Sequence, residues 1–209
     1  MTFLELQTYV LDRLSISSGD TGKVTQIKSI LNGERYRVAA RYRLLTTTDT
    51  LDFTAATETV SLPSDVTEVL SIRRGSILMQ PVTEDAYGEM VAVGASTGDG
   101  PLYYARSGTG VIRVYGVPSE TVAGAATLHY VKRPTALSSD SDTPSELPAE
   151  YHELLGERAV QVIALSEEEP GLAAAAGALA DRLEAGLREW LNRYGGTGER
   201  RLLLNVYGR

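Results

Sequence analysis

The chain has 209 residues, 43% of them hydrophobic and 22% charged, which suits one folded domain or one domain with a large insertion. It has no cysteine, so disulfides, thiolate metal sites and cysteine nucleophiles are excluded. The net charge of −7 argues against a protein that grips nucleic acid, because affinity for phosphate comes from clustered basic side chains.

The first predicted element is a helix over residues 2–15. Thr2 and Glu5 have the spacing of a capping box, in which each side chain accepts a free N–H of the first turn. Apolar residues then recur every three or four positions, as expected for a helix with one buried face. The segment lacks the basic-then-apolar layout of a signal peptide, and no stretch of the chain reaches the roughly 18 apolar residues that span a bilayer. We therefore expect a protein kept in a cytoplasm, or in a particle assembled there.

A second helix is predicted from Asp20, a suitable N-cap, to about Leu45. Gly33 lies inside this span and predicts a bend or break. The second half of the helix carries a basic flank, made of Arg35, Arg37, Arg41 and Arg43. We rank solvation of the helix as the first interpretation of this flank, contact with a neighbouring subunit as the second and contact with DNA as the third.

At about Thr46 the spacing of apolar residues changes from a helical to a strand-like period, which predicts antiparallel β-structure in the middle of the chain. Its clearest feature is a hairpin, with strands over 102–106 and 111–117 on either side of the turn SGTG. Alternation along the second strand places Arg113 and Tyr115 on the same face. The pattern around the hairpin predicts further short elements: strands within 46–63, 66–72, 77–79 and 126–132, one or two helical turns from Thr83, and a turn-rich loop over 94–101.

After the strands, residues 135–148 are rich in Ser, Asp, Thr and Pro and predict an extended, solvated connection. Glu150 begins a helix that ends at the SEEEPG turn, because proline cannot sit inside a helix. Pro170 can start the last helix, whose small side chains allow close packing and which runs to about Tyr194. Glycines at 195–196 are expected to close it.

The terminal helices predict one α-helical bundle, with the strands as an inserted antiparallel β-rich subdomain, so that the fold class is α+β. No internal repeat is visible. The expected divisions of the chain are residues 1–46 and 147–196 for the helical bundle, 47–134 for the β-rich insertion, 135–146 for the linker and 197–209 for a C-terminal docking tail.

The candidate catalytic and ligand sites are all better explained as structure. His129 lies in a strand pattern and His152 in the first turn of a helix, and no nucleophile motif accompanies either. The segment 17–24 departs from the phosphate-loop pattern at two positions, which favours a turn followed by a helix cap. Asp140 and Asp142 begin like a calcium loop that a proline then interrupts. We therefore expect no catalytic residue, no cofactor and no metal.

Two further segments are candidates for contact with partners. An acidic run fans around the end of a helix, where a solvated surface is the favoured interpretation and contact with a neighbouring subunit the alternative: Glu167, Glu168 and Glu169. The last residues form a largely apolar segment after a glycine-bearing hinge: Arg201, Leu202, Leu203, Leu204, Val206 and Tyr207. This segment either packs on its own domain or docks on a partner as a strand or peptide.

Four stretches of the chain carry a recognisable pattern of residue type and order: TFLELQTYVLDRL near the start, LPSDVTEVLSIRR (62–74), VIRVYGVPSETVAGAATLHYVKRPTAL (111–137) and the LPAEYHELL helix. Together with the order of the elements, they resemble the head-to-tail adaptor, or connector, proteins of tailed bacteriophages and related gene-transfer particles. The resemblance covers most of the chain. The short all-helical adaptors lack the β-rich insertion.

The resemblance implies a ring of identical subunits, commonly twelve, beneath the portal protein at the neck of the virion. In such proteins the ring extends the DNA channel and provides the surface to which the tail attaches. The helical bundle would form the ring wall, the β-rich insertion would point toward the tail or the outside, and the C-terminal segment would reach the portal. Double-stranded DNA would pass through the lumen without specific binding, and the acidic balance fits such a channel because like charges repel.

Two other functions stay open at this point. A tail-completion or stopper protein of the neck would share the compact fold but bind other tail or neck proteins. A small-ligand-binding or hydrolase domain would need a pocket with converging polar groups, and the sequence shows no such cluster.

Overall fold

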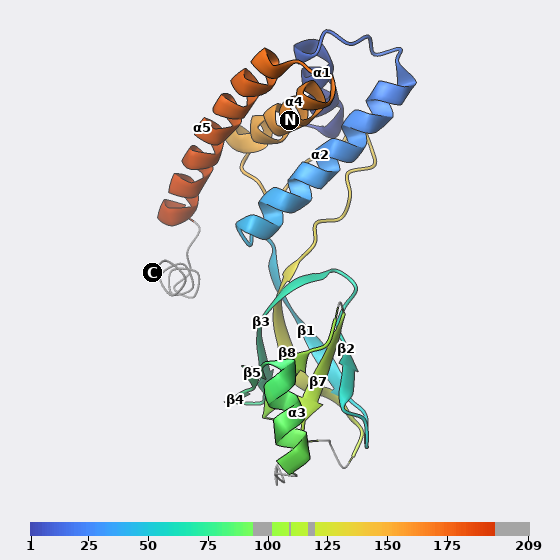
Figure 1. Ribbon diagram of the computed structural model, residues 1–209, viewed down its shortest axis with the longest axis vertical. Coiled ribbons are helices and arrows are strands. Elements are labelled where there is room, and N and C mark those ends of the chain that lie inside the picture. Colours follow the sequence, from blue (N-terminus) through green and yellow to red (C-terminus); the bar gives the residue numbers. More distant parts are fainter. Residues whose placement is uncertain (94–101, 109, 117–119, 195–209) are drawn as a thin grey trace. The chain divides into compact units, whose positions relative to one another are not determined.

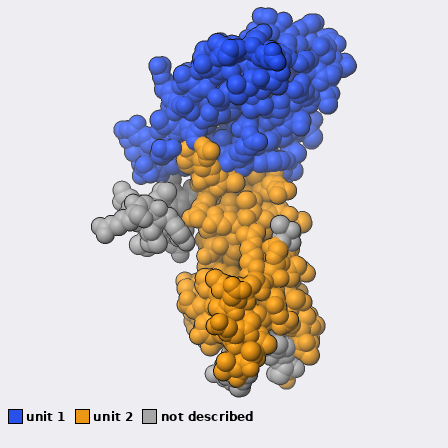
Figure 2. Space-filling model, in the orientation of Figure 1, with its two compact units in different colours: residues 1–38, 135–209 blue, residues 39–134 orange. Residues whose placement is uncertain are grey.

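The computed structural model describes residues 1–93, 102–108, 110–116 and 120–194. Helices lie at both ends of the chain and two four-stranded sheets lie between them (Figure 1), so the predicted α+β class is confirmed. The chain divides into two compact units (Figure 2). The helical unit comprises Met1–Val38 and the chain from Thr135 onward, and the β unit comprises Ala39–Pro134.

The first helix, α1 (Phe3–Arg13), begins with the predicted capping box of Thr2 and Glu5. Its first two N–H groups also have acceptors, because Phe3 and Leu4 donate to the carbonyls of Asp142 and Asp140 at 2.7 and 3.1 Å. The start of α1 therefore has the partners that a helix end needs when it is covered by another segment.

The second helix, α2 (Thr21–Arg41), is continuous, and the bend predicted at Gly33 is wrong. It begins after Asp20, whose carboxylate accepts the N–H of Lys23 at 3.0 Å, as predicted. One glycine inside a helix costs about 1 kcal/mol, which is less than the burial of a single large apolar side chain contributes. Ile27 and Leu31, both 0% exposed, supply that burial just before the glycine.

The C-terminal helices are α4 (His152–Ser166), preceded by the short 3-10 helix η1 (Ala149–Tyr151), and α5 (Pro170–Tyr194). Pro170 is the first residue of α5, where its missing N–H leaves no helical bond unmade. The small side chains of α5 pack against α4, as predicted. At Gly177 a Cβ atom would lie 2.6 Å from Nε2 of Gln161, so the amide of Gln161 lies directly over this glycine and would have to move for a larger residue.

Residues 135–148 contain no helix or strand and most of them are exposed, as predicted, but the segment is also anchored on the helical unit. Leu137 and Leu147 are buried. The side-chain amide of Asn32 donates to the carbonyl of Leu137 at 3.1 Å and accepts its N–H at 2.8 Å. Polar composition correctly predicted that most of the segment is exposed, but it did not reveal these anchoring contacts with a helix that is distant in sequence.

The β unit is a sandwich of two sheets. Sheet A has the order β1 (Thr46–Phe53), β8 (Val122–Lys132), β3 (Val66–Arg74) and β4 (Ile77–Leu78). Sheet B has the order β2 (Thr59–Ser61), β7 (Val111–Tyr115), β6 (Tyr103–Arg106) and β5 (Gln80–Val82). Side chains of both sheets meet in one core, which includes Leu51, Ile72, Ile112, Val114 and Leu128.

Both pairs of sheet edges are joined by the chain itself. β1 leads directly into β2 on one side, and β4 leads into β5 on the other through the buried Met79. One strand pair departs from the antiparallel pattern. β5 and β6 are parallel because the helix α3 (Glu84–Val93) carries the chain back between them, and α3 packs on the outer face of sheet B through Tyr87.

Candidate functional site

The basic flank of α2 is largely neutralised by carboxylates of the same chain. Arg35 is buried, forms a two-point ion pair with the buried carboxylate of Glu146, and donates to the carbonyl of Thr135 at 2.6 Å. Arg37 is exposed and pairs with Glu34 one turn earlier. The potential available for binding a phosphate is therefore lower than the sequence alone indicates.

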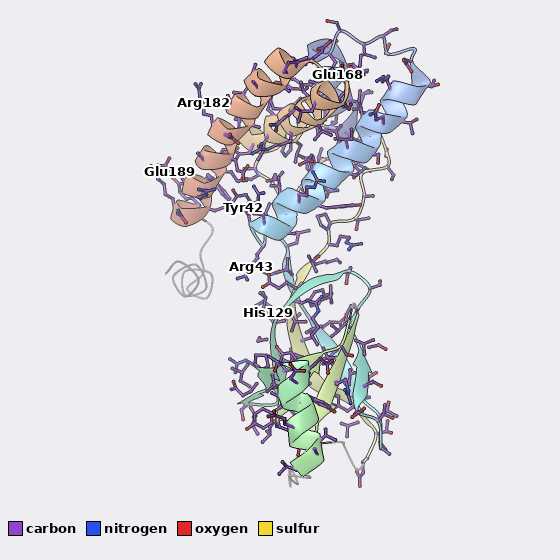
Figure 3. The ribbon with its side chains drawn as sticks, viewed as in Figure 1. Tyr42, Arg43, His129, Glu168, Arg182 and Glu189 are labelled. Carbon is purple, nitrogen blue, oxygen red and sulfur yellow. The ribbon has the colours of Figure 1, made fainter. Side chains whose placement is uncertain are left out.

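The other two predicted arginines lie in the β unit. Arg43, labelled in Figure 3, donates to both carboxylate oxygens of Glu68, at 2.8 and 2.5 Å. Arg41 is the exposed last residue of α2. The four arginines therefore do not share one environment: one is buried in the helical unit and three lie at the surface.

The predicted acidic run forms the turn between α4 and α5. Glu167 pairs with Lys23 of α2, and Glu169 accepts the N–H of Ala173 through its carbonyl as α5 begins. Glu168, between them, has φ of 60° and is exposed (Figure 3). The turn thus offers two exposed carboxylates, those of Glu168 and Glu169, next to the positive end of the α5 dipole.

A buried polar cluster that the sequence did not reveal joins α1 to α4. Glu157 is 0% exposed, and it accepts the phenol O–H of Tyr9 together with two hydrogen bonds from Arg13, at 3.1 and 3.2 Å. Burial and the bond to Glu157 raise the pKa of Tyr9 above its usual range. The one sequence signal for this cluster was a glutamate on an otherwise apolar helix face. That signal could not identify the partners of Glu157, because they lie about 150 residues away in the chain.

A second cluster holds α3 against sheet B. The guanidinium of Arg113 stacks on the ring of Tyr87, 4.3 Å from its centroid, and donates to Glu58 at 2.8 Å. The phenol of Tyr87 donates to Glu58 at 2.8 Å as well. The alternation predicted for β7 is confirmed here, because Arg113 and Tyr115 both face α3 while their neighbours face the sandwich core.

Alkaline pH is expected to weaken the Tyr87 cluster. Burial and the bond to Glu58 raise the pKa of Tyr87 to about 12. Because this value lies above that of an unfolded tyrosine, the contribution of the phenol is complete below pH ~10 and is lost as the pH rises through about 12. Tyr87→Phe should therefore reduce the free energy of unfolding at neutral pH and match the wild type above pH ~12. Urea unfolding across this range measures it, and a difference that does not change with pH would contradict the assignment.

The residues considered for chemistry have structural partners. Nε2 of His152 lies 3.0 Å from the carbonyl of Leu147, and His129 lies in β8 opposite Thr48. Residues 17–24 form a turn and the start of α2, as predicted. Asp142 accepts the N–H groups of Ser138 and Ser139, and these bonds lower the pKa of its carboxyl. In the described part of the chain, no three His, Cys, Asp or Glu residues gather as metal ligands would.

The predicted C-terminal contacts lie outside the described residues: Arg201, Leu202, Leu203, Leu204, Val206 and Tyr207. The loop over 94–101 and the helix-closing glycines at 195–196 also lie outside them. Among the helices that are described, none has the length and apolar character to cross a membrane.

These features define an α+β protein of two compact units whose buried charges hold its own segments together. The chain belongs to the SU10 adaptor protein family, whose model matches residues 1–201. It is therefore a bacteriophage adaptor protein with a structural role, and such adaptors interact in general with portal and tail proteins of the phage. A comparison with curated proteins found no significant match.

Proposed function

We propose that this protein is a head-to-tail adaptor that assembles as a ring beneath the portal, extends the DNA channel and joins the capsid to the tail. The observation that carries the proposal is the family match over nearly the whole chain, which includes both the helical and the β unit. Closed cyclic rings are a common way for identical subunits to assemble, and a ring suits a junction around a DNA channel.

The charge distribution supports this role. The net charge is −7, and several of the basic side chains on α2 already face carboxylates of their own chain. A channel wall of this kind repels the DNA backbone, so that DNA passes without being held. The proposal therefore needs no specific DNA-binding site.

The exposed members of the predicted contact set are the proposed points of subunit contact. They are Glu167, Glu168 and Glu169 in the α4–α5 turn and Arg37 and Arg41 on α2. Arg35 is left out because it is buried against Glu146, although the sequence included it. Opposite charges on facing subunits would mainly determine how neighbouring subunits align in the ring, and would add less to their affinity for each other.

Mixing the purified chain with its phage portal protein tests the proposal. We expect a complex of defined stoichiometry in size-exclusion chromatography with light scattering, and a ring in electron microscopy. The double variant Glu168→Lys/Glu169→Lys should weaken ring formation. The matched control is Asp85→Lys/Glu89→Lys, which makes the same charge change on the exposed face of α3.

A chain that stays monomeric in the presence of portal would refute the ring. Binding to tail tube in place of portal would instead identify a tail-completion or stopper protein. Deleting residues 198–209 should abolish portal binding and leave the circular dichroism spectrum unchanged, because this segment is the proposed portal contact.

A further inference from the structure

The apolar face of α5 extends beyond the described residues that cover it. Five side chains at helical spacing form a stripe along the second half of α5: Leu183, Leu187, Trp190, Leu191 and Tyr194. Leu187 is 0% exposed, whereas Tyr194, two turns further on, is 70% exposed. We call this set the α5 stripe.

The burial of the stripe comes from its first part. The ring of Tyr151 in η1 packs against Gly186, where an added Cβ atom would lie 3.2 Å from the ring. The phenol of Tyr151 also donates a hydrogen bond to the carbonyl of Gly186 at 3.0 Å. Beyond that level, Trp190 and Tyr194 contact each other, with ring centroids 5.9 Å apart. An aromatic pair at the open end of an apolar stripe is a surface that gains free energy when another apolar segment covers it.

We propose that residues 202–207 of the same chain pack on the open end of the α5 stripe. These residues, LLLNVY, are apolar except for one asparagine, and the chain enters them directly from Tyr194 through residues 195–201. Three glycines in that connection, at 195, 196 and 198, permit the chain to reverse its direction.

The lengths agree with this arrangement. The stripe spans eleven residue steps of an α-helix, which is about 17 Å. Six extended residues cover about 20 Å, and the seven-residue connection reaches up to about 24 Å. A segment held by so short a connection has an effective concentration in the millimolar range, so it is favoured over the same segment of a second copy at ordinary protein concentrations.

This contact belongs to the free subunit and does not depend on the proposed ring. If the same residues also bind the portal, they leave the α5 stripe when they do so, and the stripe is then open to a second occupant. The two contacts are tested separately, because the experiment below contains no portal.

Trp190 is the only tryptophan of the chain and lies in the stripe, so its fluorescence reports the contact. The full-length triple variant Leu202→Ser/Leu203→Ser/Leu204→Ser should shift the Trp190 emission to longer wavelength and raise its quenching by acrylamide several-fold. The control Arg200→Ser/Arg201→Ser changes two polar residues of the connection that precedes the segment and should leave the emission unchanged. Matching circular dichroism spectra show that all three chains are folded.

Two outcomes overturn the proposal. One is an emission maximum and quenching that are the same in the triple variant and the wild type. The other is a wild-type emission that shifts to longer wavelength on dilution, because a second copy would then supply the segment.

Discussion

Replacing Arg35 with alanine is expected to lower the free energy of unfolding by about 3–5 kcal/mol, because it leaves a buried carboxylate without its cation. The side chains of Arg35 and Glu146 are 6% and 1% exposed, so water does not reach Glu146 to replace the lost partner. The change also leaves the carbonyl of Thr135 without its donor. Urea unfolding followed by circular dichroism measures the loss.

Two companion variants distinguish the effect of breaking this buried ion pair from the effect of removing any charge. Arg35→Met/Glu146→Leu removes both charges and should recover most of the loss, since apolar replacements of a buried pair are often neutral. Arg193→Ala breaks an exposed pair with Glu189, each side chain 64% exposed, and should change stability by less than about 1 kcal/mol. Equal losses for Arg35→Ala and Arg193→Ala would contradict the assignment.

Replacing Gly156 with alanine should be the second most damaging single change. A Cβ atom there would lie 2.7 Å from a ring carbon of Tyr9, so the ring must move. Overpacking of this kind costs about 1–3 kcal/mol, and displacing the phenol from Glu157 adds about 1–3 kcal/mol for a buried acceptor that loses a donor. Thermal unfolding should show a melting temperature several degrees lower.

Gly33 provides the matched control on another helix. A Cβ atom added there meets nothing within 4 Å, and the backbone of α2 is continuous through it. Gly33→Ala should therefore raise stability by up to about 1 kcal/mol, which is the helix propensity difference alone. Helix propensity alone predicts the same change in stability for Gly33→Ala and Gly156→Ala. Equal changes in the two variants would therefore contradict a tight contact between Gly156 and Tyr9.

Both predictions concern the way in which the helical unit holds the segment 135–148 and α1. The ion pair of Arg35 and Glu146 and the amide of Asn32 fasten this segment to α2. Glu157 fastens α1 to α4 through Tyr9 and Arg13. For an adaptor, a large part of the charge that the sequence displays is thus committed to internal contacts, and the exposed acidic turn at Glu168 is left as a candidate for partners.

Much of the fold was predictable from local patterns. The capping box of Thr2 and Glu5, the cap at Asp20 and the start of α5 at Pro170 are decided by neighbours within one helical turn. The hairpin of β6 and β7 also needed only alternation and a turn. The error at Gly33 arose because the local signal was weak compared with packing. The anchors of residues 135–148 were not predictable, because their partners lie far along the chain.

The candidate site was less predictable. Arg35 and Arg37 are two residues apart and equally basic in the sequence, yet the first is buried against Glu146 and the second is exposed beside Glu34. Helical geometry turns such residues to opposite sides, but the side that becomes buried depends on the segment that packs there. The clusters around Glu157 and Tyr87 were missed for the same reason.

By itself the sequence determined the α+β class, the positions of most helices and strands, and the exclusion of cysteine chemistry, because these depend on composition and on periodicity over a few residues. The tertiary structure alone decided which charges are buried, how the two sheets are joined at their edges, and which end of the α5 stripe is exposed among the described residues. Those features depend on contacts between residues as far apart as Tyr9 and Glu157, and the free energy of such contacts has no signature in local spacing.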